Sequence, residues 1–153
     1  MFTFHTLVLV IHISAAAMLI GGGLGISRNL KRAAAVGGTT FSLAAEDAMR
    51  RGGILGMSSL LTILTGVGLI FLIGGFAVAP LNFHIALGLM LIGFVVSSTV
   101  MRPGLNAVVA QSKNPTPDPA AIAAGLKKMA AAQGILHLLW VVVLCLMLVR
   151  IYR

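Results

Sequence analysis

Residues 2–26, FTFHTLVLVIHISAAAMLIGGGLGI, contain no acidic, lysine or arginine side chain but include two histidines. The stretch is long enough to cross a bilayer, which takes about 20 mostly apolar residues. His12 lies near its middle, where an ionisable side chain costs free energy and usually marks a functional site. The stretch therefore predicts a membrane helix that carries a ligand.

The rest of the chain repeats this pattern. Of 153 residues, 59% are hydrophobic and only 9% are charged, which is typical of a membrane protein. We expect one domain, residues 1–153, that is all-α: an antiparallel bundle of four transmembrane helices at about 3–26, 53–79, 81–101 and 130–150. The first span has no basic region before it and is too long for a signal peptide, so we expect it to be retained.

The basic residues predict the topology. They gather between spans one and two and between spans three and four, at Arg28, Lys31, Arg32, Arg50, Arg51, Arg102, Lys113, Lys127 and Lys128, whereas only Arg150 and Arg153 follow span four. By the positive-inside rule both long loops are cytoplasmic and both termini are outside, as in a multi-pass protein of a bacterial cytoplasmic (inner) membrane. The net charge of +8 then indicates the lipid bilayer rather than a nucleic acid as partner.

Local signals predict the connections. Pro80 marks a short turn that makes spans two and three antiparallel neighbours. In the first long loop a helix from about Ser42 to Arg51 is expected, capped by Ser42. In the second, Asp118 resembles an N-cap with Pro119 at the first helical position, and this helix could run on into span four.

The four histidines are the candidate ligands. His5 and His12 lie seven residues apart and share one face of span one. Depths counted from the outer ends of the spans pair His12 with His137 near mid-membrane and His5 with His84 nearer the outer surface. A four-helix bundle can hold a haem between two such imidazoles, so we expect one or two haem b groups with these histidines as iron ligands.

Each histidine also has a simpler interpretation. His5 could be an interfacial side chain exposed to water, and His84 a helix-start residue at the headgroup level. His12 and His137 could each donate a hydrogen bond to a neighbouring Ser, Thr or carbonyl group. Cys145 is the one cysteine, which excludes an intramolecular disulfide and a cysteine-ligated iron–sulfur cluster.

Two segments resemble a known family. The order His12, Gly22, Arg28 in the first span is similar to helix one of the four-helix HemJ-type protoporphyrinogen oxidases, and Asn82-Phe83-His84-Ile85-Ala86 is similar to their Trp-x-His-x-Lys segment. CopD-like membrane domains for copper resistance look similar in the first helix, with its histidine and glycines, and in a second helix that resembles the LLTILTG stretch at residues 60–66. The resemblance implies haem binding through His12.

The chain departs from the family where the family does chemistry. Ala86 stands at the lysine position, Leu19 at an aromatic position, and the Asn-Glu-x-Pro start of the last helix is absent. The resemblance therefore does not carry over the oxidase activity, and an electron-transfer haem protein is favoured over an enzyme.

Together these observations predict a small membrane cytochrome that transfers electrons through a bis-histidine haem. Arg28 could pair with a haem propionate if the haem lay near the cytoplasmic side. The alternatives are a copper-handling CopD-like protein, a porphyrin- or quinone-linked oxidoreductase, and a structural subunit of a membrane complex. A redox partner or quinone and a homo-oligomer are compatible with the sequence.

Overall fold

The computed structural model describes residues 3–149, which form helices joined by short connections and no strand. The helical segments are α1 (Phe4–Gly22), α2 (Ile26–Val36), α3 (Gly38–Leu72), α4 (Leu81–Val96), the π-helical segment η1 (Ser97–Met101), α5 (Arg102–Ser112) and α6 (Pro119–Leu148). The predicted fold class, an all-α bundle with four helices long and apolar enough to span a membrane, is confirmed. Arg150 and Arg153 lie outside the described residues.

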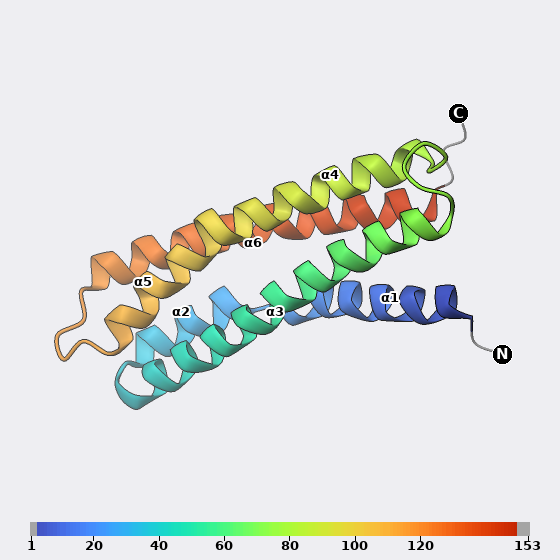
Figure 1. Ribbon diagram of the computed structural model, residues 1–153. Coiled ribbons are helices and arrows are strands. Elements are labelled where there is room, and N and C mark those ends of the chain that lie inside the picture. Colours follow the sequence, from blue (N-terminus) through green and yellow to red (C-terminus); the bar gives the residue numbers. More distant parts are fainter. Residues whose placement is uncertain (1–2, 150–153) are drawn as a thin grey trace.

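The bundle is elongated, and its connections lie at its two ends, except that between α1 and α2, which lies partway along it (Figure 1). The α2–α3 and α5–α6 connections lie at one end, and the α3–α4 connection lies at the other, near the first and last described residues. α4, η1 and α5 form one continuous rod that runs along α6. α3 runs along the bundle from the end near α2 to the opposite end, where α4 begins.

Two helix ends differ from the predicted spans. The second span ends at Leu72 rather than at residue 79, because Gly74 and Gly75 adopt positive φ angles of 113° and 92°. The connection between α3 and α4 is therefore residues 73–80, longer than the Pro80 turn predicted. The first span ends at Gly22, not at residue 26.

Two local predictions for the loops had different outcomes. Asp118 is the N-cap of α6, where its side chain accepts a hydrogen bond of 2.8 Å from the Ala120 N–H, and α6 runs without interruption to Leu148 as predicted. The prediction of a separate helix from Ser42 to Arg51 is wrong, since these residues lie inside α3. Ser42 caps nothing and donates its hydroxyl proton to the Thr39 carbonyl.

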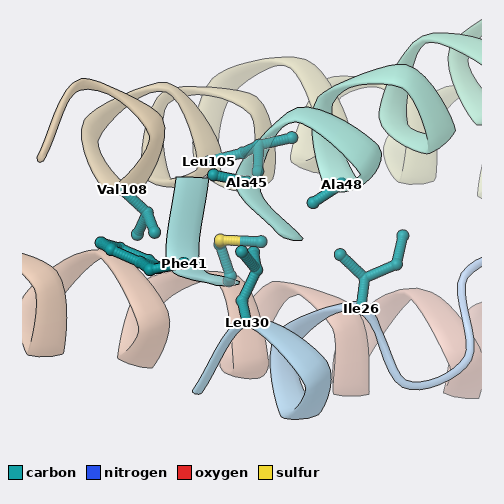
Figure 2. Close-up of a cluster of buried hydrophobic side chains, with 8 residues drawn as sticks. Ile26, Leu30, Phe41, Ala45, Ala48, Leu105 and Val108 are labelled. Carbon is teal, nitrogen blue, oxygen red and sulfur yellow. The ribbon is translucent and has the colours of Figure 1, made fainter. Parts of the chain in front are cut away.

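The charged half of the bundle has its own core. We define the charged half as α2, residues 38–51 of α3, α5 and residues 119–128 of α6. Eight side chains from these helices and the adjoining turn of α6 pack into one buried cluster (Figure 2): Ile26, Leu30, Phe41, Ala45, Ala48, Leu105, Val108 and Met129. The helices thus continue past the apolar segments and pack against each other there.

We define the apolar half as α1, the rest of α3, α4 and the rest of α6. Most of its side chains are not buried inside the protein. Between 11% and 22% of the residues in its four apolar windows are buried inside the protein. α1 packs mainly on α3, and α4 packs mainly on α6. Side chains such as Leu138 and Leu148 are exposed, which suits helices surrounded by lipid.

Candidate functional site

The first membrane helix is broken where it reaches α6. α1 ends at Gly22, and Gly25 adopts a left-handed φ of 82° before α2 begins at Ile26. A break in a membrane helix frees backbone carbonyls, which need donors in a medium without water. The amide of Gln133, buried on α6, donates to the Gly23 carbonyl, and its side-chain oxygen accepts a hydrogen bond of 2.7 Å from the Ser27 hydroxyl. Gln133 therefore joins α6 to both sides of the break.

His137 lies one turn from Gln133, against the break. Its Nδ1 lies 2.7 Å from the Gln133 carbonyl oxygen, so Nδ1–H is the donor and Nε2 carries the lone pair. Nε2 is buried and has no hydrogen-bond partner among the described residues. A Cβ atom placed on Gly23 would lie 3.8 Å from the Cε1 atom of His137, an ordinary van der Waals contact, so the ring packs close to the backbone of the break.

His12 has a similar donor arrangement at a different place. The Thr65 hydroxyl donates to the Leu61 carbonyl at 2.6 Å, so its oxygen accepts from the Nδ1–H of His12 at 3.0 Å. The half-buried ring lies against α3, where a Cβ atom on Gly66 would be 3.2 Å from His12 Cε1. The simpler interpretation of His12 and His137 was a hydrogen bond to a neighbouring hydroxyl or carbonyl group. The Nδ1 atom of each histidine makes such a bond.

His84 holds the connection between α3 and α4. Its Nδ1 lies 3.2 Å from the Pro80 carbonyl oxygen and its Nε2 lies 3.1 Å from that of Phe76. The Phe76 ring packs against the imidazole at 5.8 Å and meets the edge of Phe71 at 5.6 Å. A neutral imidazole donates from one nitrogen only, so His84 donates a hydrogen bond to one of these two carbonyls, which gives it a structural role in the connection.

The His5 side chain lies exposed on the first turn of α1 and makes no hydrogen bond to another residue within 3–149. The ring of His84 is directed to its own connection, through Phe76 and Pro80. The expected pairing of His5 with His84 therefore has no direct contact to support it.

The pairing of His12 with His137 from counted depths is not what the structure shows. His137 contacts the site of Gly23, which is eleven residues from His12 along α1. At 1.5 Å per residue, those levels are about 16 Å apart. The counting assumed four upright helices with flush ends, whereas α1 diverges from α6 towards the terminal end (Figure 1).

No other group completes a metal cluster in the part of the chain that is described. Residues 3–149 contain no group of three or more His, Cys, Asp or Glu side chains close enough to hold a metal ion. The carboxylates all lie in the charged half, with Glu46 and Asp47 on α3 and Asp118 at the start of α6. His137 is the one side chain whose imidazole nitrogen is both buried and without a partner in that part of the chain.

Sequence reasoning missed two parts of this site. Ser27 and Thr65 were not singled out, although each is a hydroxyl within or beside an apolar stretch, which is the available signal. Gly25, with its positive φ, is the N-cap of α2 and separates this helix from α1. The contact of Gln133 with both sides of this break gives the reason for its position.

Comparison with known proteins adds no assignment, because no family model, curated protein or solved structure matches this chain.

Proposed function

We propose that this protein is a membrane-bound b-type haem protein in which His137 is an axial ligand of the iron. The observation that carries the proposal is the buried Nε2 atom of His137, which has no hydrogen-bond partner within residues 3–149. Leaving a buried polar atom unpaired costs about 1–3 kcal/mol, so such an atom calls for a ligand. A metal ion bound at Nε2 removes that cost.

The other ring nitrogen supports the same role. Histidines that ligate a metal usually donate their second N–H to a carbonyl or carboxylate, which fixes the tautomer and orients the ring. His137 has such a bond in its contact with the Gln133 carbonyl. The ring also lies against Gly23, the residue that follows α1, so it is held next to the break in the first membrane helix.

The scarcity of other donors favours haem over a copper ion. A bare metal ion takes most of its ligands from protein side chains, and no cluster of three is present within residues 3–149. A porphyrin brings four nitrogen donors of its own, so a single imidazole is sufficient to hold its iron. A lone unpaired histidine therefore suits haem better than the CopD-like alternative.

Arg28 is the proposed partner of a haem propionate. It is exposed, lies five residues beyond Gly23 and has no ion-pair partner among the described residues. Since His137 contacts the site of Gly23, a propionate directed to the charged half would approach this guanidinium. A charge-assisted hydrogen bond of that kind orients the group as well as binding it.

His12 is the second candidate ligand. Its Nδ1–H is held by Thr65, as that of His137 is held by a carbonyl, and the resemblance to the HemJ-type family points to the same residue. Because its level is about 16 Å from that of His137, the two imidazoles would serve separate groups in this arrangement. The first haem is assigned to His137.

A bound haem would supply reversible one-electron transfer, and the role proposed for the protein is electron transfer at the membrane to a redox partner or quinone. His137 holds the iron, Gln133 orients His137, and the apolar half excludes water. By the positive-inside rule the charged half lies in the cytoplasm of a bacterium and both termini lie outside the cytoplasmic membrane.

The test is the visible spectrum of the detergent-purified protein, oxidised and dithionite-reduced, with a pyridine haemochrome assay. The proposal predicts a reduced α-band that is lost in His137→Ala and kept in the matched control His5→Ala. The same assay on His12→Ala measures any second haem as a partial loss of haem per chain. A protein that stays colourless after haem supplementation overturns the proposal and favours a structural subunit.

A further inference from the structure

We propose that the outward face of α3 binds one anionic phospholipid, with an acyl chain along the helix and the phosphate on Arg50. The face forms a shallow groove of about 470 Å³. Its lining residues all belong to α3: Arg50, Gly53, Ile54, Met57, Ser58, Leu60, Leu61 and Leu64. This inference is independent of the proposed haem.

The groove is apolar and uncovered. Met57 is 69% exposed and Leu64 is 59% exposed, so no described helix lies over them. A Cβ atom on Gly53 would meet nothing within 4 Å, which leaves a notch between the side chains of Arg50 and Met57.

One end of the groove carries a free positive charge. Arg50 and Arg51 are the last charged residues of α3, which continues without a charge to Leu72. Arg51 is paired with Asp47 at 2.7 Å, whereas Arg50 has no ion pair among the described residues. Arg50 thus lies where the charged half meets the apolar half, at the level of lipid headgroups.

The length of the groove suits an acyl chain. From Arg50 to Leu64 is 14 residues, or about 21 Å of helix. A leaflet contributes about half of the 30 Å hydrocarbon core, so the groove runs from the headgroups to beyond the depth of the chain ends. An anionic headgroup is favoured over a zwitterionic one because the Arg50 guanidinium forms no ion pair within residues 3–149, not even with Glu46 one turn earlier.

The experiment is native mass spectrometry of the full-length protein, titrated with phosphatidylglycerol or phosphatidylcholine. We expect phosphatidylglycerol to bind more tightly, and Arg50→Gln to weaken it about five-fold, because one cation near the membrane contributes roughly that factor. Gly53→Leu fills the notch and should weaken both lipids. Glycerol phosphate, which has the headgroup charge but no chain, should not bind detectably.

Two variants on the same helix serve as controls. Arg51→Gln removes a cation one residue away that is already paired, and Gly56→Leu adds the same bulk at an exposed glycine outside the groove. Both should keep the lipid preference, and none of the four variants should unfold at a clearly lower temperature than the wild type. Equal loss in Arg50→Gln and Arg51→Gln overturns the proposal, since general surface charge would then explain binding. A dimer mass abolished by Gly53→Leu would assign the face to a second copy instead and equally overturn it.

Discussion

The Nδ1 atom of His137 lies 2.7 Å from the carbonyl oxygen of Gln133, four residues earlier on the same helix, while its Nε2 atom is buried and unpaired. Gln133 thus contributes to the site through both its backbone and its side chain. The backbone of Gln133 orients the imidazole, and its side chain holds the broken end of α1 and the start of α2. Changes at Gln133 should therefore affect both stability and the state of His137.

Replacing Gln133 by Leu should lower the stability of the bundle by about 1–4 kcal/mol. The change removes two hydrogen bonds and leaves the Gly23 carbonyl and the Ser27 hydroxyl without their partners. Thermal unfolding in detergent measures the loss. Ser27→Ala is the control: it removes the hydroxyl itself and one of the two bonds, so its effect should be smaller. Equal stability of Gln133→Leu and wild type would contradict the role of this side chain.

Gly125→Ala should destabilise the charged half by about 1–3 kcal/mol, because overpacking forces neighbours to move. An added Cβ would lie 2.6 Å from Val108 Cγ2 and 3.1 Å from the Gly104 carbonyl oxygen. Gly134→Ala on the same helix has nothing within 4 Å and should be neutral or stabilising by up to about 1 kcal/mol. Circular dichroism melts should show a lower unfolding temperature for Gly125→Ala than for Gly134→Ala. Matching melts would indicate that α5 and α6 do not pack as closely as described.

Thr65→Val should cost about 1–3 kcal/mol, because it leaves the Nδ1–H of His12 without its acceptor. The variant keeps the shape of the side chain and removes only the hydroxyl. Thr99→Val, whose hydroxyl bonds only to the Val95 carbonyl one turn earlier, is the matched control and should have little effect. Chemical denaturation followed by tryptophan fluorescence measures both. A loss in Thr99→Val as large as that in Thr65→Val would show that His12 adds nothing to the bond.

His84→Ala should loosen the connection of residues 73–80 without unfolding the bundle. The imidazole lies between the Phe76 and Pro80 carbonyls, donates to one of them and packs on the Phe76 ring, and these contacts would be lost together. Hydrogen exchange followed by mass spectrometry should show faster exchange in residues 73–83 and unchanged exchange in α5 and α6. His84→Gln, whose amide can donate one of these bonds, should show an exchange rate in residues 73–83 between those of the wild type and His84→Ala. Unchanged exchange in His84→Ala would remove the structural role given to this histidine.

The number and type of helices could be predicted because each apolar stretch must satisfy its backbone internally. The residues at which the helices begin and end could not be predicted in the same way. Nothing in the residues between Asp47 and Gly53 stops a helix, so α3 begins at Gly38, far from its apolar part. The opposite error occurred at residue 79, where an apolar run continued past Gly74 and Gly75, whose positive φ angles end the helix.

The candidate site was predictable by residue type but not by arrangement. Histidines in apolar stretches are visible in the sequence, and the structure gives both His12 and His137 a held Nδ1–H. Their relative level depends on how α1 and α6 cross, which depth counting leaves out. That Gln133 and Gly23 meet depends on the same crossing, which only the packed helices reveal.

The most direct test of the account is chemical rescue of His137→Gly. This variant replaces the imidazole by space, and externally added imidazole can then act as the missing ligand. The account predicts that the purified variant lacks the reduced haem α-band of the wild type and regains it when haem and imidazole are added together. The same treatment of His5→Gly should change nothing, because that variant keeps its band. A wild-type protein that binds no haem, or a His137→Gly variant that keeps the full band without imidazole, would contradict the assignment of His137 as the iron ligand.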